Sequence, residues 1–138
     1  MRPYYEQDGI TIYHGDSTEI YEVQGDEAVI SDPPYGMAYD TNGARFTRGG
    51  RTLPSVRGDD EPFNPSPWSV GKWCVLWGFN HFPYGLSGGG ALVWLKRADA
   101  AFGVFLSDAE VAWTNNGCGV YVYRDTRHPI AGEPQHPT

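Results

Sequence analysis

The tetrapeptide Asp32-Pro33-Pro34-Tyr35 is the part of this 138-residue chain whose residue types most clearly suggest chemistry. It combines a carboxylate, two prolines that restrict the backbone, and an aromatic ring. It directly follows residues 27–31, whose Ala-Val-Ile centre predicts a strand. In open α/β sheets, ligands bind at the carboxyl ends of the strands. The alternative is structural: Asp-Pro-Pro can simply end a strand, because proline cannot continue a sheet ladder and aspartate favours turns.

Six short segments show the patterns of strands, and weaker helix signals lie between them. The strands are expected at residues 9–14, 27–31, 72–77, 91–96, 110–114 and 120–123. Asp16-Ser17-Thr18-Glu19 has the form of a capping box and predicts a short helix, with further short helical pieces at 65–71 and 80–86. Strands separated in this way predict an α/β fold with a largely parallel sheet. Residues 37–67 lack periodicity and are expected to form one long loop.

Charge is distributed unevenly along the chain. The formal net charge is −7, which argues against a dedicated nucleic-acid clamp because such proteins are usually basic. Residues 36–58 are the exception, with four arginines against one aspartate. These arginines are candidates for phosphate contacts, and a solvated loop is the alternative interpretation. They are Arg45, Arg48, Arg51 and Arg57.

Several classes of protein and site are not expected. The longest apolar runs have five residues, whereas a membrane span needs about twenty. The N-terminus lacks the apolar core of a signal peptide, and two cysteines cannot build a disulfide framework. The four histidines have no spacing that suggests zinc. We therefore expect a single cytoplasmic domain over residues 1–138, with no membrane and no metal.

The motif and five further segments resemble S-adenosylmethionine-dependent DNA amino-methyltransferases of the β class. Asp32-Pro33-Pro34-Tyr35 looks like the catalytic motif of that family, and Gly9 to Asp16 looks like the strand and Gly-Asp that precede it. The other similar segments, in chain order, are Trp77 to Phe82, Leu92 to Arg97, Ser107 to Asn115 and Gln135 to Thr138. One departure is Leu95, which stands where the family commonly has aspartate. The resemblance implies a Rossmann-like methyltransferase sheet, mostly parallel with an antiparallel strand.

The resemblance implies methyl transfer from S-adenosylmethionine to the N6 amine of adenine in double-stranded DNA. The amine is a poor nucleophile because its lone pair is delocalised into the ring. Asp32 and the Pro33 carbonyl would accept its two N–H groups, Pro34 would help to fix the backbone, and Tyr35 would stack on the flipped base. Cytosine N4 is the alternative target, since the family's adenine preference for Asp-Pro-Pro-Tyr is statistical.

The same resemblance suggests further site residues. Asp16 would contact the adenosine end of the cofactor, although a helix cap is an equal interpretation. His136 and Thr138 would line the methionine end. Trp113 and Asn115 are candidates for the target pocket, with core packing as the alternative for Trp113.

The family's Gly-rich cofactor turn has no counterpart in this sequence. We therefore expect a fold that is incomplete at its C-terminal cofactor-binding part, as in a truncated or split enzyme. Such a chain would expose a sheet edge to a complementary C-terminal chain or to a second copy of itself. The alternative is a non-catalytic remnant of the fold that binds DNA or a partner.

Overall fold

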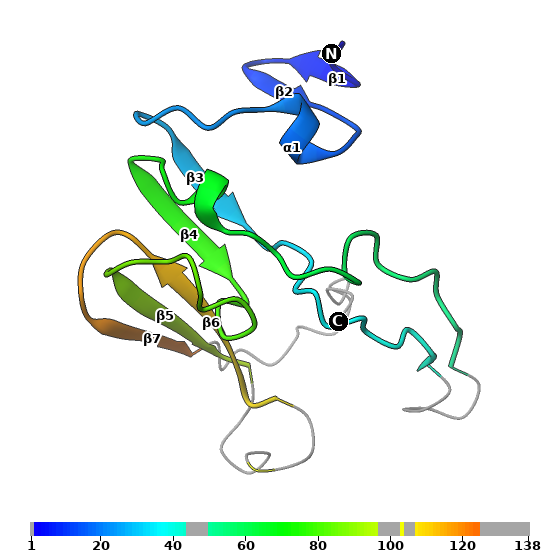
Figure 1. Ribbon diagram of the computed structural model, residues 1–138, viewed down its shortest axis with the longest axis vertical. Coiled ribbons are helices and arrows are strands. Elements are labelled where there is room, and N and C mark those ends of the chain that lie inside the picture. The colour runs from blue at the N-terminus through cyan, green and yellow to red at the C-terminus, as the bar shows by residue number, and fades with distance from the viewer. Residues whose placement is uncertain (1, 44–49, 97–102, 104–106, 125–138) are drawn as a thin grey trace.

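The computed structural model describes residues 2–43, 50–96, 103 and 107–124, which form two β-sheets (Figure 1). The smaller sheet is a hairpin of β1 (Tyr5–Gln7) and β2 (Ile10–Ile12). Its two-residue turn, Asp8-Gly9, has φ values of 52° and 79°. Asp-Gly is a sequence that hairpin turns of this kind favour, because both central residues need positive φ. The predicted strand at 9–14 is thus shorter than expected and lies outside the main sheet.

The larger sheet has five strands in the order β3-β4-β6-β5-β7. Their bounds are β3 Ala28–Ser31, β4 Trp73–Trp77, β5 Gly90–Leu95, β6 Ala109–Thr114 and β7 Val120–Arg124. The pairs β3–β4 and β5–β7 are parallel, whereas β6 runs antiparallel to both of its neighbours. The five predicted strands from residue 27 onward are therefore all present in one sheet.

The predicted fold class, an α/β Rossmann-like arrangement, was wrong. The protein is mostly β, about 7% helical, and no helix in the described part of the chain reaches seven residues. The helices that the structure describes in full are α1 (Ser17–Ile20) and the 3-10 helix η2 (Ser66–Trp68), while the expected helical piece at 80–86 forms turns. Glycine and proline interrupt the connections that would have to supply the covering helices, and both residues destabilise helix interiors. The sheet is mixed and not mostly parallel, and its antiparallel strand is β6.

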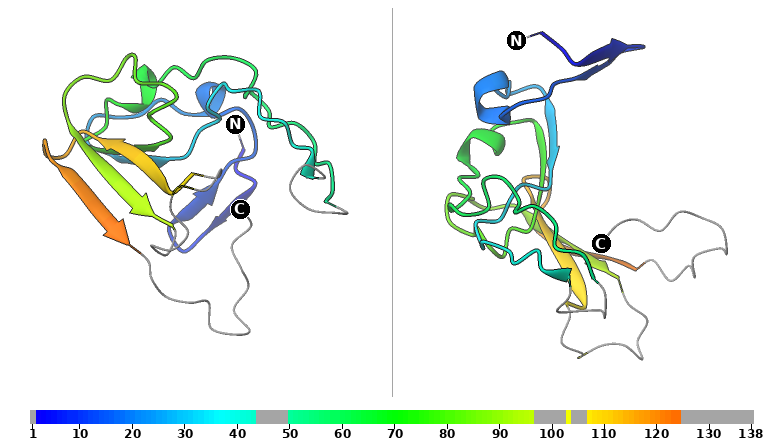
Figure 2. Two further views of the ribbon diagram at one scale, coloured as in Figure 1. Left: turned by 90° about the horizontal axis from the view of Figure 1, so that it is seen from below. Right: turned by 90° about the vertical axis from the view of Figure 1, so that its right-hand side faces the viewer.

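The core lies on one face of the sheet, under the connection that leads from β3 to β4 and the turns that follow β4. Cys74 and Leu76 are completely buried there because alternate residues of β4 point to the same face. They pack with Phe82 and Trp113, and the partly buried ring of Trp68 in η2 lies against this cluster. Figure 2 shows η2, in green, beside β3 and β4. This packing brings η2 close to the strand that ends at the Asp-Pro-Pro-Tyr motif.

The hairpin β1–β2 and the helix α1 lie on the side of β3 that faces away from β4 (Figure 1). Asp16 caps α1 by accepting hydrogen bonds from the Thr18 backbone N–H at 3.0 Å and from the Thr18 hydroxyl at 2.7 Å. The cap interpretation of Asp16 is therefore confirmed. Among the described residues, no helix is long and apolar enough to cross a lipid bilayer.

Candidate functional site

The motif lies where two parallel strands end side by side. Ser31, the last residue of β3, is paired in register with Leu76 of β4. Asp32 follows β3 directly and Gly78 follows β4 directly, so the segments 32–35 and 78–82 leave the sheet at the same edge. Parallel strands place their carboxyl ends together, and this local rule is what assembles the site.

Tyr35 is fixed by contacts on its ring and on its hydroxyl group. The hydroxyl donates a hydrogen bond of 2.5 Å to Oδ1 of Asp32. The ring stacks on His81 with 4.8 Å between the ring centroids and 8° between the planes. The pKa of the Tyr35 hydroxyl is raised mainly by partial burial and, to a smaller extent, by the hydrogen bond to Asp32. The hydroxyl therefore stays protonated and can donate its hydrogen bond to the Asp32 carboxylate.

Gly78 makes room for the Tyr35 ring. A Cβ atom at this position would lie 2.0 Å from Cε1 of Tyr35, and the backbone has φ of +76°. Only glycine adopts that conformation without strain while leaving the ring in place. Gly78 belongs to the Trp77 to Phe82 segment singled out from the sequence, although its role there was not foreseen.

Asp59 organises the backbone that follows the motif. Its Oδ1 accepts hydrogen bonds from the backbone N–H groups of Tyr35 and Gly36 at 3.0 and 2.9 Å, and of Met37 at 3.3 Å. Its Oδ2 accepts from the N–H of Tyr39 at 2.7 Å. The residue is 5% exposed, and these backbone hydrogen bonds, that from Tyr39 above all, lower the pKa of its carboxyl group. An ionised carboxylate thus holds residues 35–39 in one conformation.

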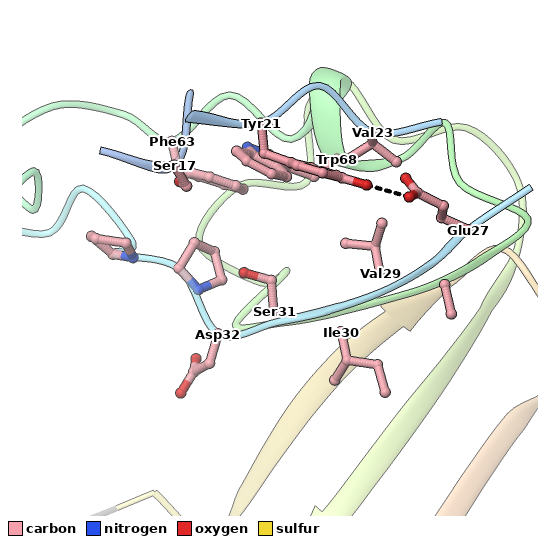
Figure 3. Close-up of a pocket in the computed structure, with 13 residues that line it drawn as sticks. Ser17, Tyr21, Val23, Glu27, Val29, Ile30, Ser31, Asp32, Phe63 and Trp68 are labelled. Atoms are coloured by element: carbon pink, nitrogen blue, oxygen red, sulfur yellow. Dashed lines mark hydrogen bonds between the residues drawn. The ribbon is translucent and has the colours of Figure 1, made fainter. Parts of the chain in front are cut away.

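A pocket of about 690 Å³ lies beside β3, and we call it the β3 pocket. Figure 3 shows Tyr21 and Trp68 above the side of β3 that carries Val29 and Ser31, while Asp32 points to the other side. The Tyr21 hydroxyl donates a hydrogen bond to the Glu27 carboxylate, and this bond links two residues of the pocket wall. The lining residues are Ser17, Tyr21, Val23, residues 27–34, Phe63 and Trp68.

A second pocket of about 430 Å³ lies against the motif, and we call it the Tyr39 pocket. Its outer walls are Met37, Tyr39 and Val56, each about half exposed. Asp32, Pro33, Pro34, Tyr35 and Asp59 complete the lining. Residues 32–34 line both pockets, so the motif is the wall between them.

The predicted cofactor residues are placed only in part. Asp16 directly precedes Ser17, which lines the β3 pocket, and its carboxylate is exposed. The hydrogen bonds from Thr18 lower the pKa of the Asp16 carboxyl group, so it is ionised near neutral pH. His136 and Thr138 lie outside the described residues.

The structure describes residues 37–43 and 50–67 of the long loop that carries the arginines. Residues 41–43 run antiparallel to residues 51–53, with a bridge between Asn42 and Thr52. Arg51 and Arg57 are exposed on this loop, and Arg57 lies close enough to Asp16 to contribute to the lowered pKa of that carboxyl group. Arg45 and Arg48 lie outside the described residues.

Trp113 and Asn115 line neither the β3 pocket nor the Tyr39 pocket. Trp113 is a core residue with 6% exposure, and its indole N–H donates to the Gly88 carbonyl at 2.8 Å. The side chain of Asn115 accepts from the Cys74 backbone N–H and donates to the Gly71 carbonyl. Asn115 thus stabilises the start of β4, at the end of the strand opposite to the motif.

Two residues at this site, Asp59 and His81, were not identified as site residues from the sequence. His81 lies in the Trp77 to Phe82 segment but was given no role there, and Asp59 is 20 to 24 residues from the backbone it holds. The turn-forming Gly58-Asp59 sequence after the basic loop was the available signal, but it does not reveal the partner. The described residues contain no group of three or more side chains able to hold a metal ion.

No protein-family model matches the chain, and no curated protein or solved structure matches it either.

Proposed function

We propose that this chain transfers a methyl group from S-adenosylmethionine to the N6 amine of adenine in DNA. The observation that supports the proposal is the position of Asp32-Pro33-Pro34 as the wall shared by two pockets. A transfer reaction needs two binding sites that meet at the reacting atoms. The resemblance of the motif to that of the DNA amino-methyltransferases supplies the reaction class.

The size and the lining of the β3 pocket support its proposed role as the cofactor site. Its volume of about 690 Å³ lies within the usual range for small-molecule sites. Tyr21, Phe63 and Trp68 offer flat rings for an adenine base and an aromatic face for a cationic sulfonium. The ionised Asp16 beside Ser17 is suited to accept hydrogen bonds from ribose hydroxyls. When bound there, S-adenosylmethionine supplies the methyl group, whose C–S bond breaks as the N–C bond forms.

Two acceptors at the motif would prepare the amine. Tyr35 occupies Oδ1 of Asp32, and in the described part of the chain no donor is bonded to Oδ2 or to the Pro33 carbonyl. These two oxygens would accept the two N–H groups of the amine and direct its lone pair toward the methyl group. The proton released after transfer would pass to Asp32 or to water. The hydrogen bond from Tyr35 holds the carboxylate in place throughout.

The DNA would be held by the loop that follows the motif. Arg51 and Arg57 are exposed there and can contact phosphates, as can the other two arginines of the basic segment. The target base must leave the duplex to reach the motif. The whole chain has a net charge of −7, so the basic segment 36–58 is the part expected to attract DNA.

Methyl transfer by the purified chain tests the proposal. The chain would be incubated with radiolabelled S-adenosylmethionine and unmethylated DNA, and the DNA digested to nucleosides. We expect N6-methyladenine from the natural chain and at least a hundredfold less from Asp32→Asn, which keeps the side-chain size but removes the carboxylate. Asp26→Ala, at an exposed turn, is the matched control and should retain activity.

Other products would have definite meanings. N4-methylcytosine would keep the reaction and overturn the choice of base. Absence of methylated nucleosides, together with DNA binding that Asp32→Asn leaves intact, would contradict the proposal and favour a non-catalytic DNA-binding module. Because the sequence predicts a truncated or split enzyme, the contradiction requires that methylation stay absent when a complementary C-terminal chain is added.

A further inference from the structure

The Tyr39 pocket is lined by three large apolar side chains that a loop leaves about half exposed. Met37 is 49% exposed, Tyr39 48% and Val56 49%, and all three face one concavity beside Asp32. Large apolar side chains held half exposed around one hollow are typical of a binding site for a flat apolar ligand. The Asp32 carboxylate adds a hydrogen-bond acceptor at the same hollow.

Tyr35 is poorly suited to be the stacking surface of this pocket. Its ring already stacks on His81, packs closely against Gly78 and belongs to the rim of the hydrophobic core. Its hydroxyl is bonded to Asp32. The ring is therefore held by its own chain, and its role is to fix the carboxylate.

Tyr39 has the opposite character: its backbone is fixed and its ring is accessible. The backbone N–H donates to Oδ2 of Asp59 at 2.7 Å, the shortest of the four bonds that this carboxylate accepts from the backbone of residues 35–39. Gly36, with φ of +72°, makes the turn that precedes it, and a Cβ there would lie 2.5 Å from the Glu61 carbonyl oxygen. An anchored backbone with an exposed aromatic ring is a pre-organised stacking surface.

We propose that the Tyr39 pocket receives the unstacked adenine and that the Tyr39 ring, instead of Tyr35, stacks on it. Met37 and Val56 pack around the base, and Asp59 is the positioning residue that holds this wall. The inference rests on the proposed function for the identity of the base. It assigns the contact surface to residues that the motif itself does not include.

The chain offers a direct probe, because its two methionines are Met1 and Met37. With ¹³C-methyl methionine labelling, the Met37 methyl signal reports on the pocket and the Met1 signal is an internal control. The ligand is a short single-stranded DNA with one adenine, and the matched control replaces that adenine by an abasic site. We expect the ring current of the bound base to shift the Met37 signal with the first oligonucleotide and not with the second.

Variants then assign the stacking ring. Tyr39→Ala should weaken binding of the adenine oligonucleotide about tenfold, within the range known for base–aromatic stacking. Tyr39→Phe keeps the ring and should bind within about twofold of the natural chain. Tyr35→Phe also keeps its ring, so it should weaken this binding much less than Tyr39→Ala does, while it reduces methylation because the bond to Asp32 is lost. The unliganded Met37 signal of each variant checks that the loop is still folded.

The outcomes separate this inference from the proposed function. Equal binding by Tyr39→Ala and the natural chain, or methylation without any Met37 shift, would overturn the assignment of Tyr39 and leave the function standing. A Met37 shift that depends on Tyr39, without any methylation, would support the base pocket and contradict the function. Failure of both readouts would overturn both.

Discussion

At the scale of single residues, the site depends on side chains that satisfy or restrain the backbone beside the motif. Asp32 is held by Tyr35, Tyr35 is held by His81 and Gly78, and residues 35–39 are held by Asp59. A single carboxylate that accepts several backbone N–H groups resists protonation because the ionised form is the better acceptor. The geometry of the motif therefore depends both on the space that Gly78 leaves for the Tyr35 ring and on the charge of Asp59.

The charge of Asp59 predicts a pH dependence. Because the folded protein lowers the pKa of Asp59 below its ordinary value of 3.8, the unfolded chain takes up a proton first as the pH falls. The stabilisation is thus complete above about pH 4 and is lost as the pH falls through the native pKa. Hydrogen exchange of the amides of residues 35, 36, 37 and 39 should accelerate over that interval, beyond the intrinsic change with pH.

Asp59→Asn should remove this dependence, because an amide offers one acceptor oxygen in place of two and does not titrate in this range. Protection of these amides should be reduced at every pH, with a lower melting temperature. Asp60→Asn, at the exposed neighbouring position, is the control and should behave like the natural chain. Unchanged protection in Asp59→Asn would contradict the anchoring role.

The close contact of Gly78 with the Tyr35 ring predicts the effect of filling the space at Gly78. Gly78→Ala combines a positive φ with a Cβ atom 2.0 Å from the Tyr35 ring, so it should destabilise the fold by about 2–4 kcal/mol. Gly9→Ala is the matched control, since its φ is +79° and no atom lies within 4 Å of the new Cβ. Urea unfolding of both variants separates the steric from the conformational cost, and equal losses would contradict the packing of Tyr35 on Gly78.

At the scale of elements, the strand ends determine what meets at the site. β3 and β4 are parallel, and their carboxyl ends bring the motif together with the segment 78–82. β6 runs antiparallel between β4 and β5, so Asn115 at its end reaches the start of β4 and not the motif. Trp113 is a core residue because β6 is the central strand and Trp113 pairs with the buried Leu76, so both side chains lie on the same face of the sheet. The antiparallel direction of β6 thus places Asn115 at the edge of the sheet opposite to the motif.

The outer strand β7 leads to a prediction about association. All five residues Val120–Arg124 are exposed, and the first four alternate valine and tyrosine without a charge. No described strand pairs with the outer edge of β7, and uncharged edges of this kind promote strand pairing between chains. We expect sedimentation velocity to show concentration-dependent self-association that Val122→Lys weakens. Identical sedimentation of the two proteins at all concentrations would contradict this expectation.

At the scale of the whole molecule, local sequence patterns predicted the strands better than their arrangement. Apolar runs and alternation located the five strands of the main sheet, and the Asp16 side chain capped α1 as its type and position indicated. The α/β arrangement failed because it required helices in connections that are rich in glycine and proline. The hairpin β1–β2 was missed as a pair, although Asp8-Gly9 is a local signal for its turn.

Features that depend on neighbouring residues could be predicted from the amino-acid order alone: where strands form, where α1 begins, and that Asp32-Pro33-Pro34-Tyr35 follows a strand. Other features became apparent only in the folded chain: the strand order, the stacking of His81 on Tyr35, the anchoring of residues 35–39 by Asp59, and the placement of the motif between two pockets. The difference lies in the distance along the chain over which each interaction acts. Propensity, capping and alternation act over a few residues. The contacts of Asp59 and His81 with residues 35–39 join positions 20 to 46 residues apart, and packing of the complete chain determines these partners.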